Sequence, residues 1–364
     1  MVAAVAGEIE LMQKLDGYIG RTVTSAIILV LLVIVGIDLL TTLIDELDDV
    51  DGNYNFLQVA RYVLLTTPSS IYEYLPFAAL VGCLAGLGSL AGTSELVVMR
   101  AAGISTARLV WAVLKPAILL TLLGLLVAEY IAPRFQQIAE SGRAMALQKE
   151  GKVHSVYGMW HREGNRYMHF NAVEAGGILH GVLVYRFGEN RELQQVLYAA
   201  RASYVADQWL AEDGTVSYFT ESEARKEAFS QRRWETVLTP QLLNILVLQP
   251  EDLSISGIWR YSRYLQEQGG SAAEYELAFW KKLLQPLAML ALVLVAISFV
   301  FGPLRQVTMG FRVFTGVMVG VVFRTLQDML GPASLVFGFE PLVATLIPIV
   351  LCLAFGVGMM MRRV

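Results

Sequence analysis

Four ionisable side chains interrupt apolar runs of this sequence that are long enough to cross a membrane. Asp38 lies in the first run, Glu129 late in the third, and Arg324 with Asp328 late in the fifth. An ionisable group in the middle of a bilayer costs at least about 2.5–3.5 kcal/mol on the insertion scale. Each of these side chains should therefore face the protein interior or a cavity.

Two interpretations of these charges are open. Arg324 and Asp328 are four residues apart and share one helix face. Counted from the outer ends of their runs, Asp38 and Arg324 lie roughly 10 Å deep, and Glu129 is shallower. The charges could form mutually satisfied structural pairs. Alternatively, Arg324, with Arg134 just above the bilayer, meets the phosphorylated head of an anionic lipid while apolar helix faces take its acyl chains.

The histidines offer no clear catalytic or metal chemistry. All four, His154, His161, His169 and His180, fall between the third and fourth apolar runs. His161 and His169 are eight residues apart on separate predicted strands, with no carboxylate or cysteine at ligand spacing. Exposed or structural roles are therefore favoured over a metal site. The sequence also lacks a Gly-x-Ser-x-Gly elbow and a His-Glu-x-x-His motif. Nothing argues for an enzyme, a resident metal or a cofactor in this chain.

The segment Thr93–Gly103 predicts a short helix outside the bilayer. Thr93 or Ser94 can cap its N-terminus, Glu95 suits the positive end of the helix dipole, and Arg100 and Gly103 suit its C-terminal end. About two apolar turns are marginal alone and must dock on something. A simple interfacial loop is the alternative interpretation.

This chain has no Gly-x4-Gly-Lys-[Ser/Thr] phosphate loop, so it cannot bind ATP in the P-loop manner. A transport protein without a motor needs an ion gradient or an ATPase partner. The short docking helix favours the ATPase.

Composition and apolar runs place the chain in a membrane. Of its 364 residues, 55% are hydrophobic and only 16% are charged, against about a quarter charged in soluble domains. The net charge of −4 argues against a nucleic-acid partner, and Cys83 and Cys352 lie in apolar runs as packing residues. Six windows are long enough to span the bilayer: Thr22–Ile44, Tyr74–Ala91, Leu109–Ile131, Leu283–Phe301, Phe311–Leu330 and Leu342–Met361.

Glycine spacing predicts close helix packing in these spans. The pairs Gly82/Gly86, Gly88/Gly92 and Gly316/Gly320 are each four residues apart. This spacing lets helix backbones approach closely in lipid. Chance in a glycine-rich membrane protein is the alternative.

Charge asymmetry predicts that both termini are cytoplasmic. The basic residues that flank the spans on this side are Lys14, Arg21, Arg100, Arg108, Lys115, Arg305, Arg312, Arg362 and Arg363. The loop after the first span is acidic, with Asp45, Glu46, Asp48, Asp49 and Asp51. The region between the third and fourth spans then lies outside, in the periplasm if the cell is Gram-negative.

The sequence of that outer region predicts an all-β domain. Together with a connecting helix, this domain occupies residues 134–268. Short alternating segments predict strands at Val153–His161, Arg166–Val173, Gly177–Phe187, Leu193–Ala206, Thr215–Glu221 and Arg232–Leu238. Turn residues separate them at 188–190, 206–208 and 212–214. This spacing suggests a sandwich or jelly roll. Ser254–Gln268 then predicts a helix that leads into the fourth span.

We therefore expect a mainly α membrane protein of six spans with this β domain inserted between spans three and four. Residues 1–133 hold an N-terminal interfacial helix, an uncleaved first span, spans two and three and the short helix. Residues 269–364 hold spans four to six.

Three motifs resemble the LptF/LptG permease family, and more closely its LptG branch. They are Ser94–Gly103, Leu253-Ser254-Ile255-Ser256-Gly257, and Ser298–Arg305, with the sequence Ser-Phe-Val-Phe-Gly-Pro-Leu-Arg. The resemblance covers nearly the whole chain, including Leu15–Gly20 at its start.

The resemblance implies a non-catalytic half-transporter in the bacterial inner membrane. Such chains pair with an LptF-like permease and sit on a dimer of LptB-like ATPases, which bind ATP and Mg²⁺. The complex extracts lipopolysaccharide and passes it to a periplasmic jelly-roll bridge toward the outer membrane, with an LptC-like helix beside the first span. Glu95 falls on the family's coupling-helix glutamate, and Leu96, Met99, Arg100 and Gly103 complete the coupling segment.

One departure from the family concerns the outer end of the first span, where lysines that meet lipid phosphates are often described. Only Asp45 plausibly matches a family acid there, so a lysine-based lipid contact is not carried over. The residues in question read Thr41, Thr42, Asp45, Glu46, Asp48 and Asp49.

Two rival functions remain open on the residues alone. Lipoprotein-release permeases also couple to a separate ATPase, but they have four spans and a large domain after the first. A scaffold that merely anchors a β domain would need no docking helix, so Glu95→Ala should leave it working.

Overall fold

The computed structural model describes residues 2–50, 54–147, 159–174, 178–188, 190–205, 208–220, 223–236, 238–239, 243, 249–267, 271–301 and 307–361. The chain divides into two compact units. The first comprises Met1–Leu40, Thr67–Ile131 and Ser254–Val364, and the second Thr41–Thr66 and Ala132–Leu253. Each unit is described by itself.

Among the residues that the structure describes, six helices are long and apolar enough to cross a membrane, which confirms the predicted number of spans. The first two are α1 (Val2–Leu47) and α2 (Phe56–Gly92). The third is a continuous run of α4 (Thr106–Leu126), the π-helical η1 (Val127–Ile131) and α5 (Ala132–Leu147). The last three are α8 (Ala273–Phe301), α9 (Met309–Phe337) and α10 (Pro341–Met361). Every expected window lies inside one of these helical runs, but the helices continue past it. Thus α2 begins 18 residues before Tyr74, and helix continues through α5 to Leu147.

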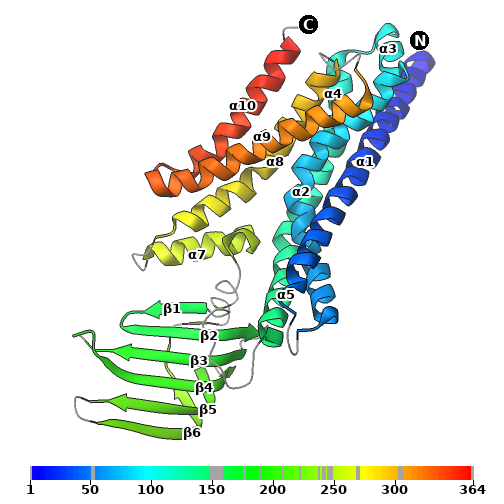
Figure 1. Cartoon of the computed structure of the whole chain (residues 1–364). Coiled ribbons are helices and arrows are strands. Elements are labelled where there is room, and N and C mark those ends of the chain that lie inside the picture. Colours follow the sequence, from blue (N-terminus) through cyan, green and yellow to red (C-terminus); the bar gives the residue numbers. More distant parts are fainter. Residues whose placement is uncertain are drawn as a thin grey trace. The chain divides into compact units, whose positions relative to one another are not determined.

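The first unit is a helical bundle whose buried core comes mainly from α2 and α8. Leu80 and Leu84 of α2 and Val293 and Ile297 of α8 are fully buried, as is Ile27 of α1. The helix α8 packs against α4, α9 and α10 (Figure 1). Many of the buried positions on α8 are alanine or valine, which lets neighbouring helices pack closely without a hydrophobic drive from water.

Two glycines of α2 let α1 approach at backbone distance, as their spacing predicted. A Cβ atom on Gly82 would lie 2.5 Å from Cα of Ile27, and one on Gly86 would lie 3.0 Å from Cα of Val23. On α9, Gly316 and Gly320 instead receive the side chains of Leu84 and Phe77, both from α2.

The pair Gly88/Gly92 does not bring two backbones together. Gly88 faces the side chain of Arg312, and nothing within 4 Å faces Gly92. Prediction of close backbone packing was therefore wrong for this pair. A four-residue spacing places two glycines on one face but does not say whether a helix lies opposite that face.

The second unit contains a six-stranded antiparallel sheet between the third and fourth spans, which confirms the inserted all-β domain. Its strands are β1 (Met159–Glu163), β2 (Arg166–Glu174), β3 (Ile178–Phe187), β4 (Leu193–Val205), β5 (Gln208–Phe219) and β6 (Ala224–Trp234). They pair in sequence order, as a meander, so these described strands do not form the crossing connections of a jelly roll. One face is buried by residues such as Phe170, Val182, Trp209 and Trp234.

The last two strands differ from their predicted bounds. The expected turn at 212–214 lies inside β5, where Asp213 has a positive φ of 50° and the strand stays paired on both sides. β6 begins at Ala224, earlier than Arg232, because its Arg, Lys and Glu side chains are tolerated on an exposed edge strand. Charges in place of apolar alternation hid this strand from sequence reasoning.

The connecting helix α7 (Ile255–Glu267) forms as predicted, with Ile258 and Tyr261 buried. Burial raises the pKa of the Tyr261 phenol above its usual value. Several expected features fall outside the described residues: the strand portion at 153–158, His154, the motif residues 302–305, and Arg362 and Arg363.

Packing of α1 on α2 gives a direct test. Replacing Gly82 by Leu should destabilise the protein by about 1–3 kcal/mol, the usual cost of overpacking, because the new side chain meets the backbone of Ile27 rather than a movable side chain. Gly92→Ala is the matched control on the same helix and should be neutral or slightly stabilising. Thermal unfolding of the detergent-solubilised chain measures both, and equal midpoints for the two variants would contradict the packing described.

Candidate functional site

The short helix α3 (Glu95–Ala101) forms where the sequence predicted it, but its N-terminus is built differently. Ser94 occupies the capping position in a left-handed conformation, with φ of 63°, and its side chain makes no capping hydrogen bond. The backbone carbonyl of Ser94 instead accepts from the N–H groups of Val97 and Val98, both at 3.1 Å. Prediction of a side-chain cap at Ser94 was therefore wrong.

The C-terminal end of α3 closes on Gly103, as predicted. Gly103 has φ of 88°, a conformation that favours glycine. The N–H of Ile104 donates to the carbonyl of Met99 at 3.2 Å, and the N–H of Gly103 donates to the carbonyl of Arg100 at 3.0 Å. This pattern of bonds is a Schellman-type end, and it satisfies carbonyls that the helix leaves open.

α3 has an anchored side and an exposed side. Leu96 and Met99 are 4% and 9% exposed and belong to the core cluster of the helical bundle. Val97 and Val98 are 43% and 66% exposed. Figure 1 shows α3 at the same end of the bundle as the beginning of α1 and the end of α10. The helix thus presents apolar surface while its other side is fixed to the transmembrane core.

Glu95 is held by two hydroxyl groups. The Tyr18 hydroxyl, from α1, donates to Glu95 Oε2 at 2.9 Å, and the Thr93 hydroxyl donates to Glu95 Oε1 at 2.8 Å. Tyr18 was missed by sequence reasoning, because 77 residues separate it from Glu95 and no periodic pattern links them. This contact ties the first residue of α3 directly to the first spanning helix.

Basic residues near α3 are also engaged with neighbouring helices. Asp16 of α1 pairs with Lys115 of α4 at 2.9 Å and with Arg108 of α4 at 3.5 Å. Arg312 at the start of α9 is 3% exposed and donates to the carbonyl of Gly88 in α2. Several of the charges that predict orientation thus also fix helix ends to one another.

The structure gives partners to the charges that the sequence places within the spans α1 and α9. Arg324 contacts Glu73 at 2.6 Å and Asp328 at 3.0 Å, and the Tyr74 hydroxyl donates to Asp38 at 2.8 Å. Glu73 and Tyr74 were not singled out from sequence, since they lie at the edge of the expected second span. The Arg324 side chain is 52% exposed and keeps carboxylate partners on two helices.

Glu129 caps the N-terminus of the connecting helix α7. It lies in the π-helical turn η1 and accepts from Ile255 N at 2.8 Å, Ser256 N at 3.4 Å and Ser256 Oγ at 2.5 Å. A carboxylate at the N-terminus of α7 is favoured by the open N–H groups and by the helix dipole. The Leu-Ser-Ile-Ser-Gly motif therefore supplies the groups through which α7 is fixed to the third span.

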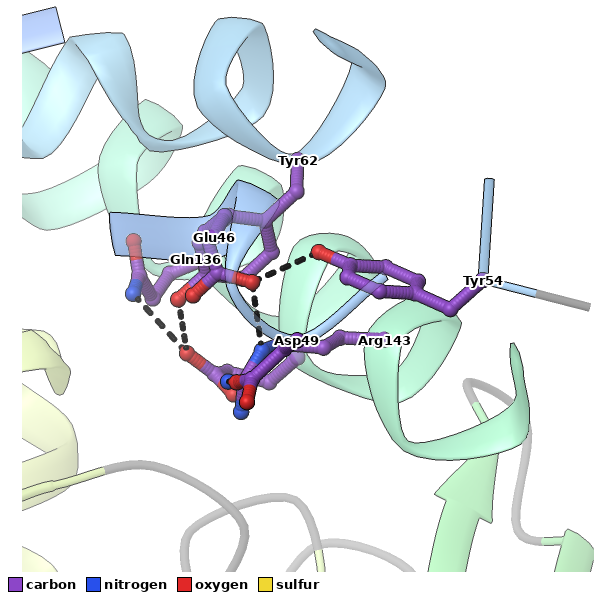
Figure 2. A network of polar contacts seen from close by, with 7 residues as sticks. Glu46, Asp49, Tyr54, Tyr62, Gln136 and Arg143 are labelled. Atoms are coloured by element: carbon purple, nitrogen blue, oxygen red, sulfur yellow. Dashed lines mark hydrogen bonds and ion pairs between the residues drawn. The ribbon is translucent and has the colours of Figure 1, made fainter. Parts of the chain in front are cut away.

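Acidic residues after the first span form a network with Arg143 in the second unit (Figure 2). Arg143 Nε lies 2.8 Å from Glu46 Oε2, and its Nη2 lies 2.5 Å from Asp49 Oδ2. The Tyr54 hydroxyl donates to the same Glu46 oxygen at 2.6 Å. Burial and this hydrogen bond raise the pKa of Tyr54, which is 1% exposed.

A second layer of this network lies between α2 and α5. The Tyr62 hydroxyl donates to Glu140 Oε1 at 2.8 Å, and the Gln136 amide reaches the same oxygen at 3.5 Å. Figure 2 shows Tyr62 and Gln136 converging on this site from two helices.

Two of the acidic residues after the first span, Glu46 and Asp49, are therefore partners of Arg143. Asp45 and Asp48 lie at exposed positions, as does Arg134 on α5.

His161 of β1 and His169 of β2 are shielded from water by burial. His169 is 1% exposed and lies against the Trp160 ring, with centroids 4.9 Å apart. Burial lowers the pKa of both His161 and His169 below the usual 6.5. Within the part of the chain that the structure describes, no three His, Cys, Asp or Glu side chains are grouped as metal ligands.

Comparisons with known proteins agree on one family. The family model described as "Lipopolysaccharide export system permease LptF/LptG" matches residues 17–362. The permease LptG of Escherichia coli K12 is 36% identical over 353 residues, which cover 96% of this chain and 98% of the relative. LptG of Haemophilus influenzae is 34% identical over 341 residues, which cover 93% of this chain and 95% of the relative.

Removing the cation of the Glu46 network should destabilise the second unit. Arg143→Gln leaves the carboxylates of Glu46 and Asp49, which are mostly shielded from water, without their cation. Each charged hydrogen bond lost is worth about 1.5–3 kcal/mol. Arg134→Gln on the same helix is the matched control, because its side chain is exposed. Thermal unfolding and limited proteolysis between α5 and β1 report the loss. Equal behaviour of the two variants would show that the network contributes nothing.

Lowering the pH should weaken the sheet. Because His161 and His169 have folded pKa values below 6.5, the unfolded chain takes up protons first. Their stabilising contribution is full above pH 6.5 and is lost as the pH falls through the folded pKa values. Thermal midpoints of the full chain should fall from about pH 7 to pH 5. The His161→Phe/His169→Phe variant should show a shallower slope, and an unchanged slope would contradict this assignment.

Proposed function

The chain belongs to the LptF/LptG family of lipopolysaccharide export permeases, and we propose that it is the membrane-spanning half of an ATP-driven complex that lifts this glycolipid out of the inner membrane. It is a multi-pass permease and not an enzyme. The observation that carries the mechanistic proposal is α3, an apolar helix fixed on one side to the transmembrane core and exposed on the other.

We propose that α3 is the docking element for the motor. A separate ATPase dimer of the LptB type binds ATP and Mg²⁺, and its groove covers Val97 and Val98, which are exposed in this chain. Leu96 and Met99 anchor the helix in the bundle, so a displacement of α3 is passed to α2 and α4 rather than absorbed by a flexible loop. Arg100 and Gly103 set the C-terminal end of the same segment.

Glu95 would provide a second connection between α3 and the spanning helices. Its carboxylate is bonded to Tyr18 on α1 and to Thr93, which follows α2 directly. When the motor pulls on this carboxylate, the hydroxyl contact transmits the change to α1. An LptF-like permease would complete the transporter as the second half, and an LptC-like protein would take the lipid onward beside α1. The six-stranded sheet would lie in the periplasm, with both chain termini in the cytoplasm.

The substrate side remains a proposal of its own. Arg324 would contact the phosphorylated head of the lipid, exchanging Glu73 or Asp328 for a phosphate oxygen, a partner that guanidinium binds in a fork geometry. Arg134 would serve the same headgroup chemistry from α5, where its side chain is exposed. Asp38 would keep its bond to Tyr74.

Replacing Glu95 tests the docking proposal. Glu95→Ala should lower ATP-driven lipopolysaccharide release from proteoliposomes by at least about tenfold, which corresponds to 1.4 kcal/mol of lost coupling. Tyr18→Phe should lose part of the same coupling while the ATPase stays bound. Glu340→Ala, an exposed acid between α9 and α10, is the control. Normal release by Glu95→Ala would favour the scaffold function.

Charge reversal at Arg324 separates lipid contact from internal pairing. Arg324→Glu should abolish lipid-stimulated ATPase activity of the assembled complex, while Arg324→Lys should retain part of it. Co-purification of the partner permease and ATPase is measured in parallel. If Arg324→Glu prevents assembly, the pairs with Glu73 and Asp328 are structural and the lipid contact is wrong.

A further inference from the structure

The sheet carries an aromatic patch on the face opposite its core. Register pairs Trp160 with His169, Arg162 with Tyr167, and Tyr167 with Tyr185, so these side chains share one face. Their sequence neighbours Met168 and Val184 face the other way, into the buried core. The second face of such a sheet usually carries polar residues. Here Trp160 is 54% and Tyr167 37% exposed.

This patch is hollowed. A cavity of about 850 Å³ is lined by its aromatic rings together with Arg162, Asn165 and Arg191. No carboxylate is among the lining residues that the structure describes. The Nε of Arg162 donates to the Gly164 carbonyl at 3.1 Å, so its Nη groups are the part of this guanidinium offered to a ligand. The hollow is therefore apolar at its base and positive at its rim.

The rings are held in place before any ligand arrives. Trp160 stacks near Tyr185, with centroids 6.0 Å apart and planes 23° apart, and Tyr167 meets Phe187 edge to face at 5.5 Å. Arg162 lies over the Tyr167 ring at 5.4 Å. The Asn165 amide nitrogen donates to the Phe187 carbonyl at 2.6 Å, and the side-chain oxygen of the same amide is a hydrogen-bond acceptor.

Arg191 is positioned by a tight turn between β3 and β4. The N–H of Gly188 donates to the carbonyl of Glu192 at 2.8 Å, and the N–H of Arg191 donates to the carbonyl of Gly188 at 3.0 Å. Arg191 has φ of 61°, a left-handed conformation that side chains rarely adopt. Backbone strain of this kind is concentrated at ligand sites.

We propose that this hollow binds a phosphorylated saccharide. Fixed aromatic rings offer flat apolar surfaces on which the C–H face of a sugar ring packs. At the rim, the Arg191 guanidinium and the Nη groups of Arg162 bind phosphate oxygens, and the Asn165 oxygen accepts from a sugar hydroxyl. The inference rests on the proposed function in one respect, since the transported glycolipid is the nearest source of such a group; a free sugar phosphate has the same chemistry.

Saturation-transfer NMR on the full chain in nanodiscs tests the proposal with glucose 6-phosphate as the probe. Glucose, observed directly, and inorganic phosphate, added as a competitor because it has no carbon-bound protons to observe, are the paired controls, since each lacks one half of the recognised group. The key variant is Arg162→Gln/Arg191→Gln, which spares the ring stack. Trp160→Phe tests the base of the hollow without emptying it. Arg225→Gln, an exposed arginine on β6, is the matched control.

We expect glucose 6-phosphate to bind more tightly than either control, and to bind at least tenfold more weakly to Arg162→Gln/Arg191→Gln. Trp160→Phe should weaken it to a smaller degree, and Arg225→Gln should bind as the unmodified chain does. Competition by phosphorylated core oligosaccharide, released from the glycolipid by mild acid, would assign the site to the transported lipid. Competition by the monosaccharide phosphate alone would assign it to a free sugar phosphate.

The proposal would be overturned if glucose 6-phosphate did not bind at tens of millimolar. It would also be overturned if Arg162→Gln/Arg191→Gln and the control Arg225→Gln bound it equally well. It would equally be overturned if Arg162→Gln/Arg191→Gln bound the sugar normally but lost a partner protein's β domain in co-purification, because the patch would then be a protein interface. The assay needs neither ATP nor a partner chain, whereas lipopolysaccharide release needs both. Failure of this site and failure of the proposed function are therefore distinguishable.

Discussion

The bilayer's inability to solvate charge is the constraint on which this structure depends. A polar group in the hydrocarbon region must find its partner within protein. In this chain the buried Arg312 donates to the backbone of α2, Asp38 accepts from Tyr74, and Arg324 has carboxylates on two helices. The Arg312–Gly88, Asp38–Tyr74 and Arg324–Glu73 contacts each join two helices, whereas Arg324–Asp328 lies within α9, so most of these contacts also hold the bundle together.

The short helix α3, which lies between two spans, depends on a different requirement, that of an anchor. A seven-residue helix has little stability of its own. Leu96 and Met99 give it a hydrophobic anchor in the bundle, and Glu95 gives it a polar link to α1. The helix is therefore fixed to the spans on one side, while its valines are exposed on the other, where the proposed ATPase would dock. At the other end of the third span, Glu129 fixes the N-terminus of α7 and so connects that span to the start of the fourth.

Much of the fold could be predicted from sequence, because apolar length and period are local signals. The six spans, α7, most strands and the bounds of α3 follow from such patterns. Contacts between distant residues could not be predicted: Tyr18 with Glu95, and Arg143 with Glu46 and Asp49, each join positions more than 75 residues apart. The polar edge strand β6 and the left-handed Ser94 also lack a pattern in the sequence, since the first is set by its neighbour strand and the second by backbone geometry.

Photo-crosslinking from α3 in living cells tests the central claim most directly. A benzophenone amino acid at the exposed Val98 should form a covalent product with the ATPase, whereas the same group at the buried Leu96 should crosslink only within the permease pair. Products from Val98 that contain periplasmic proteins or lipid, with no ATPase among them, would place α3 on the wrong side of the membrane and contradict the account.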